Sequence, residues 1–574
     1  KTDGSPMTDI ISTNITSPLG LTTAENYAAV KRGDTSLKIK DGCMGIPGKF
    51  CVGICTQEQR AALKVAGFSW FESIVLSSVR EALSHVSIDI ASPRIILILA
   101  TSTAGIDELG ETPEKDGEYL APGVAAKKIA RSLGLVNDPL LISNACISGA
   151  TAQMMADRLI GAGLYDYAIV CGADVVSAFV LAGFSSFKAL SPTYCRPFDI
   201  ERLGLNIGEC AATVILKKSE NDTPDTWRII DGCLDNDAYH VSAPLPSGDG
   251  VSRAIARILT PELKVSAACV TAHGTATMFN DQMESKAIEN AGLGSIPATA
   301  YKAHFGHTFG ASGIVEAIIT MCALDEGIIL PVLGFEEIGV SGKINISNQP
   351  RKAAGKTFVK TQSGFGGCNG AMIYSKDIAA AKKNPGHAQY CQAGEVIITP
   401  DKLVLNRNVV RAETPGYSFI TDIFKKYMAD GSRYFKMDPF SRLAYVGAGL
   451  VGGDELKDIS PEDTTVFIFT KTGSVLADRK HLSTFSSKEE FYPSPAVFIN
   501  TLPNIVLGEI AIRNNIKGET TLVMLPEEDE AVIDRVIRAT LEATNPKAMI
   551  YGWVDCADDT TFKADLKLLK QVSQ

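Results

Sequence analysis

The sequence predicts an α/β protein in which helices cover both faces of mainly parallel sheets. The first observation is that apolar, strand-like runs alternate with helix-like segments through about the first 380 residues. The second is the run Arg94–Thr101, which is almost wholly apolar, as is typical of a strand covered on both faces. The third is residues 150–160, where apolar residues recur at helical spacing. Alternation of this kind favours a layered α/β architecture.

Residues 8–220 contain the first series of these elements. The expected strands and helices are strands at 9–13, 94–101, 140–142, 167–173 and 211–217, and helices at 24–32, 123–133 and 150–160. Residues 221–380 repeat the theme. There, His273 lies at a predicted strand end, the segment 302–313 leads into a helix from Ile314, and Gly364–Gly367 joins two strands.

Composition narrows the class of protein. The chain has 574 residues, 45% of them hydrophobic and 21% charged, which is ordinary for a soluble globular protein. Its net charge of −10 argues against nucleic acid as a general partner. Thirteen scattered cysteines include no CxxC pair, and no apolar run is long enough to span a bilayer. We therefore expect a cytoplasmic protein with reduced thiols, no metal site and no membrane segment.

Cys146 lies where a buried strand turns into a helix. The positive end of that helix favours a thiolate, which makes the cysteine a better nucleophile. A lone cysteine in such a place is more often a structural core residue, and a lone histidine at a strand end is more often a hydrogen-bonded core or rim residue. Cys146 occurs, however, together with His273 and His307 on glycine-flanked turns. The three residues predict a Cys-His-His site.

Ordered motifs, rather than one continuous string, occur from about Asp9 to Tyr374. They are Ser143-Asn-Ala-Cys146-Ile-Ser-Gly149, Cys195-Arg-Pro-Phe-Asp199, Asn206-Ile-Gly-Glu209, Asp237-Ala-Tyr-His240, His273-Gly-Thr-Ala-Thr-Met-Phe-Asn-Asp281, Lys302, Gly306-His-Thr-Phe-Gly-Ala-Ser-Gly313 and Gly364-Phe-Gly-Gly-Cys-Asn369. Together these segments resemble the β-ketoacyl-acyl-carrier-protein synthases of the thiolase superfamily, most closely the type I/II elongating branch.

The resemblance implies a thiolase-like, duplicated αβαβα layered fold. Its N-terminal half would be residues 8–220, which carry the nucleophile, and its C-terminal half residues 221–380, which carry the two histidines, Lys302 and a gating phenylalanine. It further implies an acyltransferase that performs decarboxylative Claisen condensation of an acyl thioester with malonyl-acyl-carrier-protein. The pathway would be the elongation of a fatty acid or of a polyketide or polyene. The substrates would arrive on the phosphopantetheine arm of the carrier protein, with no other cofactor.

Roles for individual residues also come from the resemblance. Cys146 takes the acyl group, and its backbone N–H forms an oxyanion hole with that of Phe365, which also serves as a gate. His273 and His307 donate to the enolate, and Lys302 holds the His307 region electrostatically with support from Glu316. Thr275 and Thr277 bind the pantetheine arm.

Two departures from the family pattern affect specificity. Ser363 stands where the family usually has phenylalanine, and Ile147 beside the nucleophile is bulkier than usual. Chain-length preference therefore cannot be transferred.

Two other functions share this fold. One is a non-catalytic chain-length partner subunit, which usually lacks the cysteine. The other is a thiolase-like enzyme acting on coenzyme A thioesters, which needs a second catalytic cysteine; Cys368 is the candidate.

Residues 390–574 resemble a second, degenerate copy of the N-terminal half. Pro503 lies 381 residues after Pro122 in a similar setting, and the run ending in Gly552 parallels the run ending in Gly172. Counting back from these glycines places Pro526 where the first copy has Cys146. The alternative is an unrelated small α/β domain. As a degenerate copy, the segment would contain no nucleophile and no histidine-bearing half.

The resemblance also implies a dimer in which two N-terminal halves pair edge to edge, as in other synthases of the family. We therefore expect residues 390–574 to pack against residues 80–200 as a pseudo-dimer, joined by the polar linker Lys376–Pro385; an ordinary homodimer is the alternative. A carrier protein is expected to dock on basic residues near the site. The candidates are Arg60, Lys64, Lys127, Lys128 and Arg202.

Overall fold

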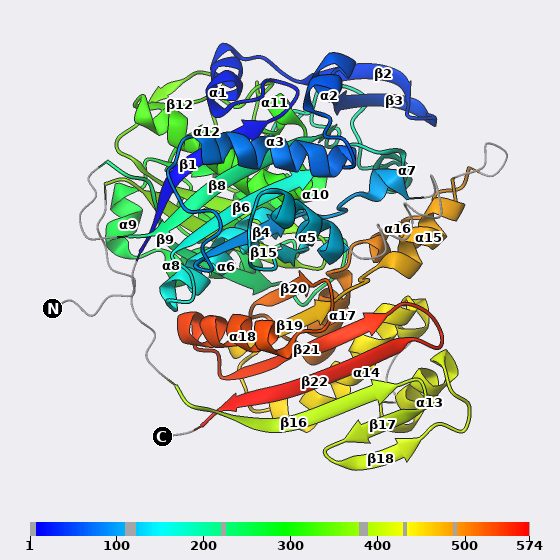
Figure 1. The fold of residues 1–574 in the computed structure, drawn as a ribbon. Coiled ribbons are helices and arrows are strands. Elements are labelled where there is room, and N and C mark those ends of the chain that lie inside the picture. Colours follow the sequence, from blue (N-terminus) through cyan, green and yellow to red (C-terminus); the bar gives the residue numbers. More distant parts are fainter. Residues whose placement is uncertain are drawn as a thin grey trace.

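The computed structural model describes residues 7–109, 122–219, 225–377, 388–428, 433–485 and 491–572 (Figure 1). Most of the expected linker, from 378 to 385, lies outside these residues. Three five-stranded units with one shared strand order make up the framework.

The first sheet belongs to the N-terminal half. Its strands, in spatial order, are β5 (Leu140–Ile142), β4 (Ile95–Ala100), β6 (Tyr167–Asp174), β8 (Cys210–Lys218) and β1 (Thr8–Thr16). β5, β4 and β6 are parallel, whereas β8 is antiparallel to both of its neighbours. Every residue of β4 is buried, as its apolar sequence predicted for a strand covered on both faces.

The second sheet repeats this order with the C-terminal half of the catalytic unit. Its strands are β9 (Arg228–Asn236), β15 (Cys368–Ser375), β14 (Thr357–Gly364), β10 (Cys269–Thr271) and β11 (Ala298–Thr299). β9 therefore corresponds to β1, and β11 to β5. A short pairing of β1 with β9 joins the two sheets.

Helices separate and cover the two sheets. α6 (Ser148–Gly161) and α12 (Ser312–Asp325) pack on strands of both sheets and form the middle layer. α3 (Trp70–Ser84) and α5 (Pro122–Ser132) cover the first sheet on its other side, and α8 (Asp249–Ile258) and α10 (Met278–Asn290) cover the second. The duplicated αβαβα layering predicted from the sequence is confirmed.

Smaller elements complete the catalytic unit. The helices are α1 (Thr23–Arg32), α2 (Gln57–Leu63), α7 (Ala178–Ser186), α9 (Pro261–Ser266) and α11 (Lys302–Phe305). The strands are β2 (Leu37–Cys43), β3 (Ile46–Gly53) and β7 (Ile207–Gly208), which form a three-stranded sheet, and the pair β12 (Ile328–Ile329) and β13 (Arg351–Lys352).

The third unit, from β16 onwards, lies below the catalytic unit in Figure 1, in yellow to red. Its strand order is β20 (Thr520–Met524), β19 (Thr464–Thr470), β21 (Ala548–Cys556), β22 (Phe562–Gln571) and β16 (Tyr390–Thr399), with β17 (Lys402–Leu405) and β18 (Asn408–Arg411) extending the edge. Its helices are α13 (Tyr417–Tyr427), α14 (Pro439–Gly452), α15 (Val475–Ser483), α16 (Pro495–Phe498), α17 (Ile505–Asn514) and α18 (Glu530–Thr544).

A repeated carboxylate fixes how the third unit corresponds to the first. Asp174 at the end of β6 accepts hydrogen bonds from the Thr101 hydroxyl and from the backbone and hydroxyl of Thr103. Asp555 at the end of β21 accepts from Thr470 and Thr472 in the same pattern.

Asp555 lies 381 residues after Asp174, as Pro503 lies after Pro122, so the offset of 381 holds from Pro122 to Asp174. In the preceding strands the offset is 369, the separation of Thr470 from Thr101. The match of Gly552 to Gly172 is wrong by one residue. Cys146 therefore corresponds to Glu527 rather than to Pro526, and the copy has a carboxylate where the first unit has its thiol.

The first and third sheets join edge to edge. β5 and β20 pair antiparallel, with Ile142 opposite Val523 and Leu141 opposite Met524. Ile142 and Val523 are also corresponding residues under the offset of 381, so the pseudo-two-fold axis passes between them. Hydrophobic cores cross this junction on both faces of the joined sheet. The sheet therefore continues through ten strands from β1 to β16.

Buried polar groups reinforce the junction. Arg158 on α6 forms two bonds with Glu519, at 2.7 and 2.8 Å, and both side chains are about 5% exposed. The Asn144 side chain donates to the Thr520 carbonyl (3.0 Å) and accepts from the Leu522 N–H (2.9 Å). Removing one partner of a buried ion pair typically costs about 3–5 kcal/mol. The strand end that carries the nucleophile is thus bonded directly to the third unit.

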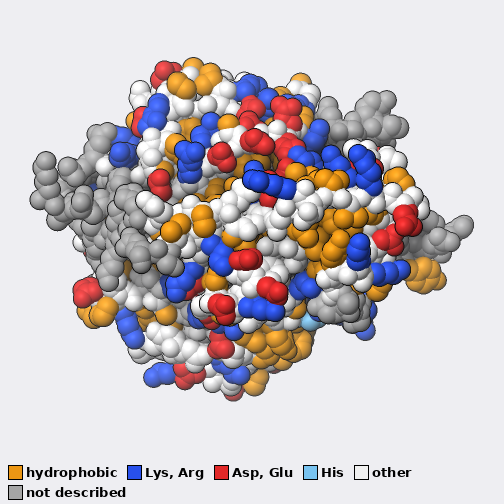
Figure 2. All heavy atoms as spheres, turned by 90° about the horizontal axis from the view of Figure 1, so that it is seen from below, with side chains coloured by type: hydrophobic (Ala, Val, Ile, Leu, Met, Phe, Trp, Pro, Cys, Tyr) orange, Lys and Arg blue, Asp and Glu red, His pale blue; other side chains and the backbone are white. Residues whose placement is uncertain are grey.

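Charge and hydropathy at the surface are mixed. Figure 2 shows the molecule from below the view of Figure 1, with positive and negative side chains interspersed among hydrophobic patches. Among the described residues, no single helix is long and apolar enough to cross a membrane. Two consecutive helical segments with a bend between them, Pro495–Thr501 and Ile505–Asn514, are together long and apolar enough by length and composition alone.

Candidate active site

Cys146 sits on the predicted strand-to-helix turn. After β5 the chain passes through a short 3-10 helix, Ala145–Ile147, which leads directly into α6. Ala145 has a φ of 47°, in the left-handed region that a side chain disfavours by about 1–2 kcal/mol. The Ser148 hydroxyl donates to the Ala145 carbonyl and accepts from the Asn144 N–H, which holds this turn. The turn places Cys146 at the head of the middle-layer helix.

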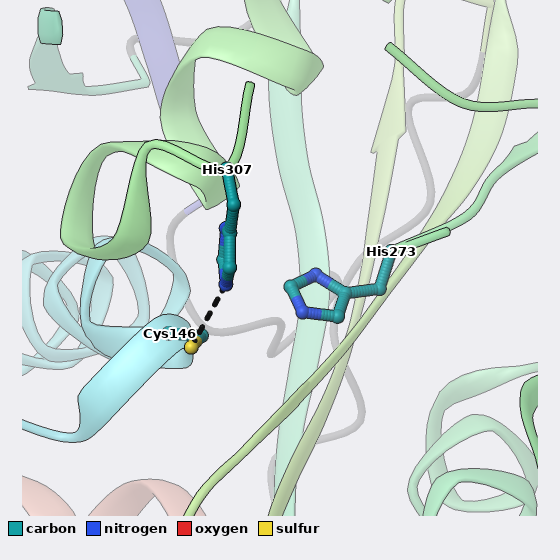
Figure 3. A group of neighbouring side chains, drawn as sticks. All are labelled: Cys146, His273 and His307. Carbon is teal, nitrogen blue, oxygen red and sulfur yellow. Dashed lines mark hydrogen bonds between the residues drawn. The ribbon is translucent and has the colours of Figure 1, made fainter. Parts of the chain in front are cut away.

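The structure brings Cys146, His307 and His273 together, as Figure 3 shows. The sulfur of Cys146 lies 3.0 Å from His307 Nε2. The two imidazole rings lie 5.2 Å apart between centroids and nearly perpendicular. Both histidines are 1–2% exposed. Residues 161 positions apart in the sequence thus form a direct contact because the two halves of the fold meet at the middle layer.

The protein environment keeps all three groups neutral. Burial lowers the pKa of His273 and of His307 well below the usual value, and the Lys302 ammonium adds to both shifts. Cys146 is only partly shielded from solvent, yet the dense protein around it raises the pKa of its thiol to about 12. Desolvation thus outweighs the helix end and favours the thiol over the thiolate that the helix end alone led us to expect. The site holds a thiol next to a neutral imidazole.

Lys302 contacts His273 rather than the His307 region. Its ammonium lies 3.1 Å from His273 Nδ1 and donates to the His273 carbonyl at 2.5 Å. It also pairs with Glu316 Oε1 at 2.6 Å, as expected for its supporting residue. An ammonium has only protons to give, so Nδ1 of His273 accepts and Nε2 carries the proton. On the His307 ring Lys302 acts electrostatically, as expected, and it adds a direct contact with His273 that was not expected.

The same three ligand atoms could in principle share a metal ion, since they lie within 4.8 Å of one another. The Lys302 ammonium beside His273 opposes a cation at this point. Hydrogen-bond donors and a positive charge suit a developing anion instead.

A cavity of about 380 Å³ opens onto Cys146. Thr275 and Thr277 line it, and their hydroxyls lie 2.9 Å apart. Phe365 also lines it and stacks with Phe184 at 6.1 Å between ring centroids. A cavity of this size fits an extended thioester arm. The residues predicted to bind the arm and to gate the cavity therefore all line it, and their roles stay predictions.

The turn Gly364–Gly367 lies against the nucleophile. A Cβ added at Gly364 would be 3.3 Å from the Cys146 backbone nitrogen. Ser363, the departure noted in the sequence, is buried and donates to Asn369 Oδ1 at 2.9 Å. This packing places the backbone nitrogen of Cys146 beside the turn that carries Phe365, the two residues whose amides the resemblance assigns to the oxyanion hole.

Several supporting residues escaped the sequence analysis. The Asp174 carboxylate also accepts from the Gly310 N–H (2.7 Å), which fixes the turn after His307. Glu284 accepts from the backbone N–H groups of His273 and Gly274 at 2.7 and 2.8 Å. Gln362 donates to the Cys146 carbonyl at 3.4 Å. In the sequence, nothing next to any of these polar residues indicates a role in the site.

The basic residues proposed for carrier docking are mostly engaged within the chain. Arg60 pairs with the buried Glu209, and Lys127 and Lys128 pair with Asp138 and Glu72. The Lys64 ammonium donates to the Phe68 carbonyl, and Arg202 is 4% exposed and donates to backbone carbonyls. Their spacing in the sequence could not reveal these partners. Each of the five is thus bonded within the chain, and carrier docking on them stays a prediction.

Cys368 faces the third unit rather than the cavity. It is 1% exposed, and its sulfur lies 3.6 Å from Asn504 Nδ2 and 3.7 Å from Thr520 Oγ1. A thiolase-like second catalytic cysteine is therefore not supported by this residue.

Comparison with known proteins agrees with this geometry. Residues 64–222 match the family model of the beta-ketoacyl synthase N-terminal domain, and residues 228–336 match that of the C-terminal domain. The chain is 31% identical over 294 residues to 3-oxoacyl-[acyl-carrier-protein] synthase 2 of Synechocystis sp., covering 47% of this chain and 70% of the relative. It is 32% identical over 249 residues to the enzyme of that name from Mycobacterium tuberculosis, covering 41% and 60%.

Two solved structures share the fold, one over about two thirds of the chain and one over nearly all of it. A ketosynthase in complex with its chain length factor from Xenorhabdus doucetiae gives a TM-score of 0.54 at 24% identity, covering 64% of this chain and 98% of that one. A structure titled PfaC Keto synthase-Chain length factor gives 0.73 at 14% identity, covering 99% and 78%. With its motifs, its layered halves and its Cys-His-His cluster, the chain belongs to the β-ketoacyl synthase family.

Proposed function

We propose that the chain is a β-ketoacyl-acyl-carrier-protein synthase that condenses an acyl thioester with malonyl-acyl-carrier-protein. The observation that carries the proposal is the contact of 3.0 Å between Cys146 and His307, with His273 beside it, at the end of a cavity of about 380 Å³. A non-catalytic partner subunit has no use for an assembled nucleophile of this kind.

The first half-reaction loads the enzyme. The Cys146 thiol gives its proton to the neutral His307 imidazole as the sulfur attacks the acyl carbonyl. The amides of Cys146 and Phe365 receive the oxyanion. The tetrahedral intermediate collapses to an acyl-Cys146 thioester, and the departing carrier thiolate takes up the proton. The arm of the carrier lies along Thr275 and Thr277.

The second half-reaction forms the carbon–carbon bond. Malonyl thioester loses carbon dioxide, and the electron pair of the broken bond moves into an enolate. Nε2–H of His273 donates to the enolate oxygen, since Lys302 occupies the other ring nitrogen. His307 donates as well, in the tautomer whose Nε2 carries the proton and whose Nδ1 accepts from the Ser312 hydroxyl 3.1 Å away. This is the opposite tautomer to the one that accepts the Cys146 proton during loading. The enolate carbon then attacks the acyl carbonyl, and the bond between the carbonyl carbon and the Cys146 sulfur breaks. The Cys146 thiolate leaves and takes up one proton from solvent, the proton that the condensation consumes.

We infer that residues 390–574 take the place of a partner's N-terminal half. Three observations support this: the β5–β20 pairing, the Glu527 that stands in for the nucleophile, and the similarity of the whole chain to a ketosynthase–chain length factor structure. The segment supplies shape and no thiol. A cytoplasmic setting fits the thirteen free cysteines, and the carrier's phosphopantetheine arm is the one prosthetic group that the proposed chemistry uses.

Intact-mass measurement after mixing the protein with acyl- and malonyl-loaded carrier tests the proposal. The expected result is an acyl adduct on the enzyme and a β-ketoacyl product on the carrier. Cys146→Ala should show neither, although it should still fold. Acylation at the normal rate in that variant, or hydrolysis without condensation in the unaltered protein, would contradict the proposal.

A further inference from the structure

A second buried lysine lies behind the pair of Lys302 and Glu316. Lys360 on β14 is 1% exposed. Its ammonium lies 2.8 Å from Glu316 Oε2, while Lys302 holds Oε1 of the same carboxylate at 2.6 Å. It also donates to the Thr361 carbonyl at 2.7 Å. One buried glutamate is thus held between two ammonium groups.

The second negative charge of this cluster comes from Glu284 on α10. Its carboxylate accepts from the Thr361 hydroxyl at 2.7 Å, next to the residue whose carbonyl Lys360 bonds. It also holds the backbone of His273. Two lysines therefore balance two glutamates in a region without solvent. A buried charge without such balance would cost several kcal/mol.

We infer that Lys360 is a positioning residue for the decarboxylation step, acting on His273 and His307 through Glu316 and Lys302. This inference rests on the proposed function. Lys360 does not line the cavity and touches neither the cysteine nor the histidines, so it has no direct part in the chemistry.

Glu316 shares its negative charge between two ammonium groups, those of Lys302 and Lys360. Without Lys360, the buried Glu316 carboxylate would neutralise the Lys302 ammonium fully and draw it away from the His273 ring. With Lys360 on its other oxygen, Glu316 leaves Lys302 free to direct positive charge at His273 Nδ1. Positive charge at this distance disfavours protonation of both imidazoles. The positive charge of Lys360 contributes to lowering the pKa of each histidine.

Charged and titratable groups reach this region from every element packed around it. They are Glu284 of α10, Lys302 of α11, Glu316 of α12, His273 after β10, His307 after α11, and Cys146 at the head of α6.

The test is the pH dependence of malonyl-carrier decarboxylation in Lys360→Met and Lys360→Gln. Glutamine retains an N–H donor for the Thr361 carbonyl and guards against a folding defect. Removing the charge should raise the histidine pKa values, so the acid limb of the rate profile moves up by about one pH unit. Lys352→Met, on the exposed strand β13, is the control and should leave the limb in place.

A second readout does not depend on the reaction. NMR titration of isotope-labelled histidines in substrate-free protein should show His273 and His307 protonating at higher pH in the Lys360 variants. An unmoved limb with unmoved histidines, or a glutamine variant that fails to fold, would overturn the inference in favour of a structural role. If the unaltered protein did not decarboxylate malonyl-carrier, the proposed function would fail while the titration still decided the role of Lys360.

Discussion

At the scale of single residues, His273 and His307 are oriented by different partners. Lys302 fixes which nitrogen of His273 carries the proton, and Glu284 holds its backbone. His307 rests on the Ser312 hydroxyl and faces the sulfur of Cys146. His307 is therefore placed to serve both half-reactions, whereas His273 is placed for the enolate alone.

This difference predicts unequal effects of the two alanine variants. His273→Ala should reduce malonyl decarboxylation by about 10²–10³-fold, as for loss of one oxyanion donor, and leave acyl loading nearly intact. His307→Ala should slow both. Separate assays of acyl-enzyme formation and of carbon dioxide release measure these effects. Equal loss of both half-reactions in His273→Ala would instead show that the residue supports the fold.

The pH dependence follows from the neutral histidines. Their pKa values lie well below 6.5, so protonation begins only in more acidic solution. Protonation leaves the donors in place, but it sets an Nδ1–H of His273 against the Lys302 ammonium and so displaces the ring. The rate of decarboxylation should therefore hold steady as pH falls through 6.5 and decline below it. Lys302→Met removes the positive charge that acts most strongly on both imidazole rings. In this variant the decarboxylation rate should begin to decline at higher pH. Rate profiles for folded protein check this, and a decline centred at or above 6.5 in the unaltered enzyme would contradict it.

Residue type and order in the sequence were enough to predict the centre of the site. Cys146, His273, His307 and the pair Lys302–Glu316 meet as expected. Contacts that depend on tertiary packing could not be predicted from the sequence. Lys360 reads locally as the polar end of a strand, and its partner Glu316 lies 44 residues away.

At the scale of elements, the β5–turn–α6 unit shows what the copy retained and what it lost. The copy β20–turn–α18 keeps the strand, the turn and the helix. In α6 nearly every residue is buried, because both sheets enclose it. In α18 only one face is buried, and Asp534, Arg538 and Glu542 point outward. The apolar pattern of each helix thus matches the number of sheets that cover it.

The sequence comparison placed the two copies one residue out of register, because it matched glycines instead of bonded side chains. Glycines in two apolar strands look alike in sequence, and a shift by one residue reverses which face a side chain takes. The repeated bonds at Asp174 and Asp555 decide the register, and they are visible only in three dimensions.

The helix α17 of the third unit touches the gating turn, and this contact predicts a remote effect. A methyl group at Gly508 would lie 2.7 Å from the Gly366 carbonyl oxygen and 3.0 Å from its Cα. Gly508→Ala should therefore displace the turn that carries Phe365 and slow acyl loading by about ten- to a hundredfold. Rapid-quench measurement of acyl-enzyme formation tests this.

Gly161→Ala is the matched control, because a methyl group there meets no atom within 4 Å. It should load at the normal rate. Normal loading by a folded Gly508→Ala variant would mean that the third unit does not influence the gate.

At the scale of the whole molecule, one chain covers the sheet edge that its own catalytic unit would expose. An unpaired edge strand invites pairing with another chain. Here β20 occupies the edge of β5, and the ion pair of Arg158 with Glu519 is buried beside it. The expectation that the third unit packs on the N-terminal half fits these contacts. The contacts also extend to the gating turn, since Asn504 donates to the Phe365 carbonyl at 2.8 Å.

The central claim is that this single chain holds both the active site and the surface that completes it. Light scattering on the chromatographic peak that carries condensation activity tests the claim most directly. The predicted result is activity that co-elutes with a species of one chain, 61.1 kDa, and a chain lacking 390–574 that aggregates or forms new dimers. Activity confined to a dimer of full-length chains, with the same dimer interface after removal of 390–574, would contradict the claim.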